Sequence, residues 1–309
     1  MSEMSYLEKL LDGVEVEWKT LGEVAKYVRG LIYSKSSESA DGQGYKVLRA
    51  NNITLSNNCL NLNDVKVVRF DTKVKSSQKL YKNDILISAA SGSREHVGKV
   101  AYIESDIDYY FGGFMGVVRC DEKLNPRYLF HVLTSDIFQK YLDEMLNSST
   151  INNLNSAVMG RFKIPLPCPD NPEKSLAIQS EIVRILDKFT ALTAELTAEL
   201  SMRKKQYNYY RDQLLSFKEG EVEWKALGEI GEVRMCKRIL KSQTSSEGEI
   251  PFYKIGTFGK EPDSYISRKL FNEFKEKYSY PKVGEVLISA SGTIGRTVIF
   301  DGRESYFQD

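Results

Sequence analysis

The feature that most constrains the fold of this chain is a long internal repeat. Residues 16–24, VEWKTLGEV, return as residues 222–230, VEWKALGEI, and the two tryptophans of the chain, Trp18 and Trp224, occupy matching positions. Two further matches follow in the same order, residues 45–47 with 253–255 and residues 84–89 with 285–290. A spacing of roughly 200 residues is far longer than a solenoid repeat. The sequence therefore predicts two copies of one domain.

Just after the third match, the first copy resembles a phosphate-binding loop, because Gly92 is followed by Gly98-Lys99. Such a loop needs four residues between the first glycine and Gly-Lys, and then Ser or Thr. Here five residues intervene and Val100 follows the lysine, while the second copy has the shorter Gly292–Arg296. A backbone cradle for phosphate could not change its length and keep its shape. We therefore expect a turn between two strands, and no nucleotide site.

Length and composition indicate a soluble globular protein of about two domains, since the chain has 309 residues and 41% hydrophobic content. The net charge of +1 gives no overall attraction to nucleic acid, but it does not exclude a local basic face. The four cysteines are scattered, which argues against zinc and disulfides and suits a reducing cytosol. No signal peptide is present, and no apolar run approaches the ~20 residues of a membrane span. We expect a cytoplasmic protein without a membrane span.

Each copy is predicted to be α+β. Short β-branched runs bounded by Gly, Asn, Asp and Ser are typical of strands, and the first copy has four: Val65–Phe70, Asp84–Ser88, Lys99–Ile103 and Met115–Arg119. Residues 127–146 have helical apolar spacing, with Asn125 as a good N-cap and Pro126 in the first turn. The proline-rich Ile164–Pro169 predicts an extended end to the domain. We expect domains at 1–169 and 220–309, joined by a spacer helix within 170–219.

The spacer is predicted as one helix from about Glu173 to Phe217, roughly 60 Å long at ~1.5 Å per residue. Its first apolar positions alternate steps of four and three, as in a coiled coil. The stripe either packs on the flanking domains or pairs with a second helix, from this chain or another. A second helix is favoured, because the helix is longer than a small domain is wide. The candidate interface residues are Ile178, Ile182, Ile185, Phe189, Leu192, Leu196, Tyr207, Tyr210 and Leu214.

The second copy is shorter than the first. It reaches Tyr306-Phe307, which matches Tyr110-Phe111, and ends at Asp309. We expect the counterpart of roughly residues 112–217 to be missing, so that the second domain is incomplete.

No catalytic or metal site is predicted. The chain has two histidines, His96 and His131, on different predicted elements, and it lacks the HExxH and GxSxG motifs. Residues 125–128, NPRY, are similar to the NPP[YF] loop of amino-methyltransferases, but Arg127 stands where that loop needs its second proline. Helix capping by Asn125 and Pro126 explains this segment without catalysis.

Two α+β copies that each open with WKxLGE and are joined by a long heptad helix resemble the specificity subunit of type I restriction-modification systems. The resemblance covers nearly the whole chain and is specific through the order of its motifs. In the first copy these are Trp18–Glu23, Asp84–Ser88, Ser91-Gly92, Val97–Lys99, Arg127–Leu129, Ile164–Pro167, Gln179 and Ile182–Asp187. In the second they are Trp224–Glu229, Ser291-Gly292 and Ile294–Arg296.

The resemblance implies that each copy is a target recognition domain for one half of a split sequence in double-stranded DNA. It implies that the long helix is a spacer that pairs antiparallel with a second helix. Modification subunits, which carry S-adenosylmethionine and methylate adenine, would dock on the helices, and a restriction subunit would cleave. The chain itself would have no cofactor and no catalysis. Because the second helix is absent from this sequence, two chains pairing antiparallel as a homodimer is a further expectation.

Candidate DNA-binding residues come from a basic stretch and three polar loops. Residues 66–99 hold eight basic side chains against three acidic ones, a local +5 that suits phosphates. Arg and paired amides suit the edges of guanine and adenine. The three loop segments are Arg49–Asn52, Ser93–His96 and Ser148–Asn153. The candidates are Arg49, Asn51, Asn52, Lys73, Lys75, Lys79, Arg94, His96, Lys99, Ser149, Thr150, Asn152 and Asn153.

Three interpretations stay open at this point. The favoured one is a DNA-recognition module of a methyltransferase complex. The second is an inactive or regulatory fragment that binds a modification subunit through its helix. The third is a coiled-coil adaptor with no role on DNA, for which steeply salt-dependent DNA binding would be contrary evidence.

Overall fold

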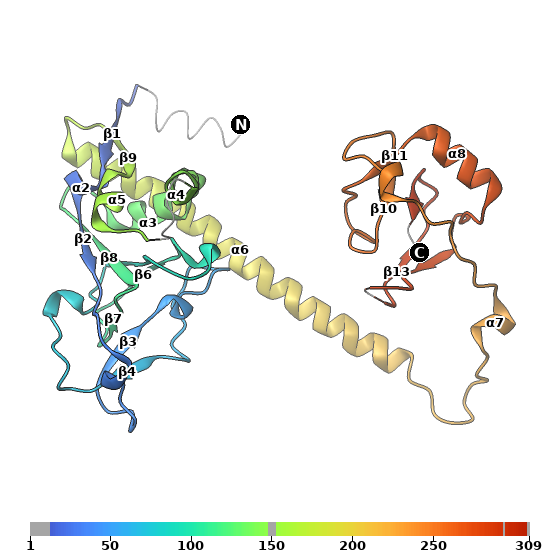
Figure 1. The fold of residues 1–309 in the computed structure, drawn as a ribbon, viewed down its shortest axis with the longest axis horizontal. Coiled ribbons are helices and arrows are strands. Elements are labelled where there is room, and N and C mark those ends of the chain that lie inside the picture. Colours follow the sequence, from blue (N-terminus) through green and yellow to red (C-terminus); the bar gives the residue numbers. More distant parts are fainter. Residues whose placement is uncertain (1–12, 148–152, 293, 308–309) are drawn as a thin grey trace. The chain divides into compact units, whose positions relative to one another are not determined.

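The computed structural model describes residues 13–147, 153–292 and 294–307 (Figure 1). The chain divides into two compact units, 1–208 and 209–309. The first contains strands, short helices and most of one very long helix, and the second contains short strands and two helices. The predicted α+β class is confirmed.

The centre of the first unit is an antiparallel sheet of four strands in the order β2-β8-β5-β6. The strands are β2 Ala25–Arg29, β5 Ile85–Ser88, β6 Val100–Tyr102 and β8 Met115–Cys120. The three of these that the sequence predicts are confirmed, with ends that differ by at most one residue. Every residue of β5 is buried, because strands flank it on both edges and both faces are covered.

The two faces of this sheet are covered by different parts of the chain. Ile85 and Ile87 belong to a core cluster with helices α3 Pro126–Thr134, α4 Asp136–Asn147 and α5 Ser156–Arg161. Leu86, between them, belongs to a second cluster that includes Leu48 and Phe111. Those two residues lie in a three-stranded sheet, β4-β3-β7, made of β3 Tyr45–Leu48, β4 Lys66–Val68 and β7 Tyr110–Phe111. The alternation follows from the two-residue period of a strand.

The single helix predicted over residues 127–146 is wrong, because two helices meet at Ser135. Ser135 has an extended backbone conformation, and both its N–H and its hydroxyl donate to the Val132 carbonyl, at 3.2 and 2.7 Å. A serine that bonds locally to the backbone competes with the helical ladder. The predicted start is confirmed: Asn125 Oδ1 accepts from the N–H groups of Arg127 and Tyr128, and Pro126 is the first helical residue.

The proline-rich segment forms strand β9, Lys163–Pro167, paired antiparallel with β1, Val16–Thr20. Pro165 and Pro167 have no N–H, and being two apart they face the same edge of the strand. The opposite edge keeps its donors, so Cys168 N–H can donate to the Glu15 carbonyl at 2.8 Å on the side of β1. On the proline side, the Tyr128 hydroxyl donates to the Pro165 carbonyl at 2.7 Å. A short turn of helix, α2 Leu21–Val24, continues from β1.

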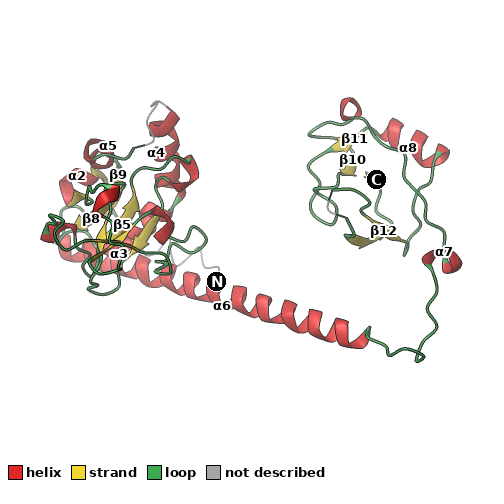
Figure 2. Ribbon diagram, turned by 60° about the horizontal axis from the view of Figure 1, so that its bottom comes forward, coloured by secondary structure: helices red, strands yellow, loops and turns green. Residues whose placement is uncertain are grey.

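The predicted long helix is confirmed as α6, Pro172–Leu214, and Figure 2 shows it as one unbroken helix. Its first turns pack on the first unit: Ile178 is buried there, and Ile182 and Val183 pack against the same core cluster. Gln179 is fully buried, with its carbonyl accepting from Asn125 N–H at 2.8 Å and its amide donating to the Lys123 carbonyl at 3.2 Å. From Lys188 onward every helical residue is exposed.

The second unit contains the strands β10 Ile250–Tyr253, β11 Tyr265–Ile266, β12 Val286–Ile288, β13 Thr297–Ile299 and β14 Tyr306–Phe307, and the helices α7 Leu227–Ile230 and α8 Arg268–Lys277. Its core gathers aromatic rings, with Phe252, Phe271 and Tyr306 buried together. The sheets have the orders β11-β10-β14 and β12-β13. Val286 and Ile288 of β12 are exposed, whereas β5, its counterpart, is buried.

Strand pairing shows how the two copies correspond. In the first copy Leu48 lies opposite Phe111 in a parallel pair, and in the second Tyr253 lies opposite Phe307. The predicted match of residues 45–47 with 253–255 is therefore wrong by three residues. The shared letters Tyr-Lys suggested it, but the hydrogen-bonded partner strand sets the register. On the corrected match, Arg49 corresponds to Lys254.

Candidate nucleic-acid interface

One of the predicted polar loops, residues 49–52, lines a surface cavity of about 660 Å³ at an end of the four-stranded sheet, together with residues that precede a second predicted loop. Arg49 and Asn51 come from the turn after β3, and Ser91 and Gly92 come from the loop after β5. The third loop adjoins them, because Asn153 forms a β-bridge with Ala90 and Leu154 N–H donates to the Ala89 carbonyl at 2.7 Å. Segments about a hundred residues apart in sequence thus form one surface, which we call the loop surface. Its cavity is lined by Arg29, Leu31, Ile32, Tyr33, Lys35, Glu38, Arg49, Ala50, Asn51, Ala90, Ser91, Gly92, Gly112, Gly113, Phe114 and Met115.

In the first loop, Arg49 and Asn51 are anchored by Asp64. Arg49 Nη2 lies 3.0 Å from Asp64 Oδ2, and Asn51 Nδ2 donates to the same oxygen at 2.9 Å. The second copy has an equivalent ion pair, between Lys254 and Asp263, also at 3.0 Å. A carboxylate that orients a cation and an amide without burying them leaves both able to contact a ligand.

Asn52 has a structural role in this loop. It is only 1% exposed, its Oδ1 accepts from Arg49 N–H at 2.8 Å, and its Nδ2 donates to the carbonyls of Asn61 and Asp64. The hydroxyl of Thr257 accepts from Lys254 N–H in the same way. The prediction of Asn52 as a base-contacting residue is therefore unsupported by its position, because its hydrogen-bonding groups face the protein.

Residues 89–99, which we call the glycine loop, connect the antiparallel strands β5 and β6, as the sequence predicts. Gly98 N–H donates to the Ser88 carbonyl and Ser88 N–H to the Lys99 carbonyl, both at 2.8 Å. In the second copy Gly295, Ser289 and Arg296 make the same two bonds, at 3.0 and 2.9 Å, between β12 and β13. Gly98 and Gly295 both have a positive φ, of 83° and 84°. The two loops therefore share their closure despite different lengths.

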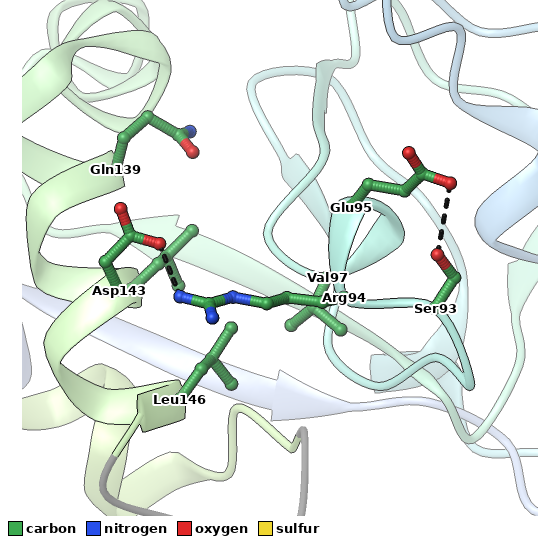
Figure 3. Close-up of a pocket in the computed structure, with 8 residues that line it drawn as sticks. Ser93, Arg94, Glu95, Val97, Gln139, Asp143 and Leu146 are labelled. Carbon is green, nitrogen blue, oxygen red and sulfur yellow. Dashed lines mark hydrogen bonds and ion pairs between the residues drawn. The ribbon is translucent and has the colours of Figure 1, made fainter. Parts of the chain in front are cut away.

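Arg94 and His96 lie in a short 3-10 turn of this loop, residues Arg94–His96. Arg94 extends toward α4, and its Nη2 lies 2.7 Å from Asp143 Oδ1 across a cavity of about 450 Å³ that Gln139 and Leu146 also line (Figure 3). Ser93 Oγ donates to Glu95 at 3.1 Å. His96 is half-buried, and its Nδ1 is a buried atom without a hydrogen-bond partner among the described residues. Both predicted residues thus lie on a loop held against the helical layer.

Of the third loop, Asn153 lies beside Ala90, where its Oδ1 is a buried atom with no hydrogen-bond partner among the described residues. Ser149, Thr150 and Asn152 lie outside the described residues.

The basic stretch is less positive in the fold than in the sequence. Glu38, Asp108 and Asp143 lie outside residues 66–99 but pair with Lys66, Lys79 and Arg94, at 2.7, 2.8 and 2.7 Å. The hydrogen bond with Asp108 raises the pKa of Lys79. A count within one segment misses carboxylates that other strands bring beside it.

The remaining lysines of the stretch differ in exposure. Lys73 and Lys75 are exposed and carry no ion pair among the described residues. Lys99 is 9% exposed, so little of its side chain is available to a phosphate. Its place beside a glycine in a loop suggested an exposed lysine, but Lys99 closes the hairpin at the start of the buried strand β6.

Sequence reasoning missed four residues that line the cavity. Arg29 and Lys35 are exposed cations, and Ile32 and Phe114 are exposed apolar residues. The sequence holds one signal for Phe114, which is the pair of glycines before it, Gly112-Gly113. Two glycines allow another part of the backbone to pack closely there, so the aromatic residue that follows them was a candidate for a surface site.

The helix stripe divides into a buried part and an exposed part. Ile178 is buried and Ile182 and Ile185 are half-buried. The others are exposed over several turns of α6: Phe189, Leu192, Leu196, Tyr207, Tyr210 and Leu214. Packing on the first unit therefore accounts for only the first turns of the predicted interface.

Two features are absent from the described residues. No group of three or more His, Cys, Asp or Glu side chains there is placed to hold a metal ion. Within those residues, no helix is long and apolar enough to cross a membrane.

Comparison with known proteins gives the family. A family model described as the type I restriction modification DNA specificity domain matches residues 13–202 and again residues 219–309. A Haemophilus influenzae protein named as type I restriction enzyme specificity subunit S.HindORF215P is 44% identical over 319 residues, covering 99% of this chain and 73% of that protein. The EcoR124I/EcoR124II specificity subunit of Escherichia coli is 43% identical over 259 residues, covering 83% of this chain. The match spans 57% of that relative.

The fold is also shared with a solved structure. That structure is titled as describing the structural basis of complex assembly and conformational transition of the type I R-M system. One of its chains superposes on this chain with a TM-score of 0.51 at 16% identity, over 95% of this chain and 73% of that one. The two segments matched by the family model cover both repeats, and the residues between them, 203–218, include the end of α6. The chain belongs to the family of type I restriction modification DNA specificity domains, of which it carries two copies.

Proposed function

We propose that this chain is the specificity subunit of a type I restriction-modification system, which recognises a sequence in double-stranded DNA and directs methylation there. The observation that carries the proposal is the loop surface: in a domain of the specificity family, loops from distant parts of the chain present Arg49, Asn51 and Ser91 around one cavity. Guanidinium, amide and hydroxyl groups are those that hydrogen-bond to base edges in the major groove.

The chemistry is assigned to partner subunits. A modification subunit binds S-adenosylmethionine and transfers its methyl group to adenine, and a restriction subunit cleaves. This chain contributes DNA recognition and no catalysis, and it acts in the cytoplasm. The similarity to proteins named as specificity subunits supports this division.

The exposed stripe of α6 is proposed to pair antiparallel with the same stripe of a second copy of this chain. From Phe189 to Leu214 it presents large apolar side chains over several turns, and no second long helix lies among the described residues. Such a face is typical of a coiled-coil seam. A dimer would place two first domains in opposite orientation and predict an interrupted palindrome as the target. Light scattering of the chain, alone and with its modification subunit, tests this, and a monomer in both would contradict it.

The proposed function is tested by purifying the chain with a type I modification subunit and selecting from a random duplex library. We expect the retained duplexes to share a motif in two parts, and adenine methylation to appear within that motif when S-adenosylmethionine is added. Affinity should fall steeply with salt, because phosphate contacts release counterions. Retained duplexes without a shared motif would contradict the proposal.

A further inference from the structure

Two large apolar side chains stand exposed at the rim of the cavity in the loop surface. Ile32 is 79% exposed and Phe114 is 73% exposed, and both line the cavity that Arg49 and Asn51 also line. Single exposed apolar residues are ordinary, but two at one cavity between polar and charged groups are typical of an interaction site.

The segments that carry these residues are joined backbone to backbone. Gly30 N–H donates to the Met115 carbonyl at 3.1 Å, Leu31 N–H donates to the Phe111 carbonyl at 2.7 Å, and Leu31 and Gly112 form a parallel bridge. The carbonyl of Phe114 accepts from Ala89 and Ala90 N–H groups, at 2.8 and 3.1 Å, which ties this segment to the glycine loop.

Glycines make this close packing possible. A Cβ on Gly30 would lie 2.0 Å from the Gly112 carbonyl oxygen, and a Cβ on Gly113 would lie 3.0 Å from Ile32 Cγ1. The contact at Gly30 is with backbone and allows no other residue type, whereas a side chain at Gly113 would require Ile32 to shift. A rigid support lowers the conformational entropy lost on binding, so these side chains are preorganised for a ligand.

Three cations line the same cavity as the apolar pair. Arg29 and Lys35 are exposed and have no ion pair among the described residues, and Arg49 lies at the same cavity. The one acidic residue that lines the cavity, Glu38, is paired with Lys66 at 2.7 Å. The cavity thus combines phosphate-binding charges, polar groups for base edges and two exposed apolar side chains. In the major groove of DNA, the one apolar group on a base edge is the 5-methyl group of thymine.

We propose that Ile32 and Phe114 contact the methyl groups of thymine in the target of the first domain, with Arg29 and Lys35 on the flanking phosphates. The proposal rests on the function proposed above and adds residues and a base identity to it. Burying one methyl group is worth roughly a fourfold change in affinity.

The test replaces thymine by uracil, which lacks only the methyl group, at each position of the selected duplex in turn. The chain bound to its modification subunit is expected to lose about fourfold in affinity at one or two positions. The variants Ile32→Ala and Phe114→Ala should bind thymine DNA more weakly by at least that factor, and each should be insensitive to uracil at one of those positions. Leu55→Ala and Phe70→Ala, of similar exposure in the same unit but outside the cavity, should keep the sensitivity of the unmodified chain.

Three results would overturn the proposal. In the first, both variants keep the affinity and the uracil sensitivity of the unmodified chain; in the second, the selected motif contains no thymine. Either result leaves the proposed function intact, because a motif is still selected. In the third, no motif is selected, and both proposals fail. Thermal midpoints equal to that of the unmodified chain will show that the variants fold, as expected for substitutions at exposed positions.

Discussion

Arg127 and Asp187 lie 60 positions apart in the sequence, and Arg127 Nε donates hydrogen bonds to both carboxylate oxygens of Asp187, at 3.0 and 3.2 Å. Arg127 is in the first turn of α3, and Asp187 is on α6. The same guanidinium lies 3.0 Å from Glu104 and stacks over the rings of Tyr102 and Phe130. This relationship fixes the long helix against the recognition domain.

Replacing Arg127 by alanine is expected to lower the free energy of unfolding of the first unit by about 1–3 kcal/mol. The loss follows because a half-buried carboxylate loses its charged partner and two rings lose a stacked cation. Urea denaturation of the full chain measures it. The control is Arg203→Ala, which removes an exposed pair with Glu199 within α6 and should change the free energy by less than about 0.5 kcal/mol. Equal losses in the two variants would contradict the assigned role.

His131 adds a pH dependence to the same contact. Burial lowers the pKa of His131 below its ordinary value of 6.5, although the hydrogen bond from Nε2 to Asp187 at 2.8 Å acts in the opposite direction. Below about pH 6.5 the unfolded chain therefore binds a proton that the folded chain does not bind. Stability from this group is complete above pH 6.5 and declines as the pH falls toward the lowered pKa.

The measurement compares thermal midpoints at about pH 7.5 and pH 5.5, where linkage predicts the difference. The thermal midpoint of the unmodified chain should fall further on acidification than that of His131→Gln, because the glutamine side chain does not titrate. The glutamine amide can still donate to Asp187, so the two proteins differ at this contact mainly in whether the side chain titrates. Equal falls in the thermal midpoints of the two proteins would show that burial of this ring does not control the pH dependence of stability.

Gly98→Ala is expected to destabilise the first unit by about 1–3 kcal/mol. Gly98 has a φ of +83°, and an added Cβ would lie 2.3 Å from Leu142 Cδ1 on α4. Gly92, in the same loop, has nothing within 4 Å of an added Cβ and no positive φ. Gly92→Ala should therefore stay within about 0.5 kcal/mol of the unmodified chain, as surface substitutions do. Calorimetry measures the stability of the two variants. Equal losses would show that the positive φ of Gly98 and the contact with Leu142 are not the cause of the destabilisation.

Arg94→Ala should weaken DNA binding and relax one base position by about 1–3 kcal/mol if the contact to the base is bidentate. Asp143→Ala is expected to act in the opposite direction, because it removes a carboxylate that lies 2.7 Å from Arg94 and repels phosphates. Fluorescence anisotropy with the selected duplex over a range of salt concentrations measures both. Unchanged affinity and motif in Arg94→Ala would remove Arg94 from the interface.

Local patterns predicted local structure well in this chain. Short β-branched runs located β5, β6 and β8, and Asn125-Pro126 located the start of α3, because each depends on neighbours in the sequence. The break at Ser135 was missed, since apolar spacing continues across it. The repeat was recognisable from its letters, but its register was wrong between β3 and β10, where the partner strand decides the alignment.

The interface residues were harder to predict, because their availability depends on contacts between distant segments. Asn52 and Lys99 have suitable side chains for DNA, but the fold buries both. Ile32 and Phe114 do not look like DNA-binding residues in the sequence, and only the packing of their two segments shows them exposed at one cavity. The three carboxylates that offset the basic stretch also come from outside it.

The pairing of β1 with β9 has a consequence for how such a protein can acquire a new target. The chain enters and leaves the recognition domain along one antiparallel ribbon, and α6 begins five residues after β9 ends, at Pro172. Segments enclosed by the ribbon can be lengthened, shortened or exchanged by recombination without moving the points of entry and exit, as long as the contacts of Asn125 and Arg127 with α6 are kept. Under the proposed function, inheritance of a different enclosed segment would change which DNA is marked, while α6 and its partners stay the same.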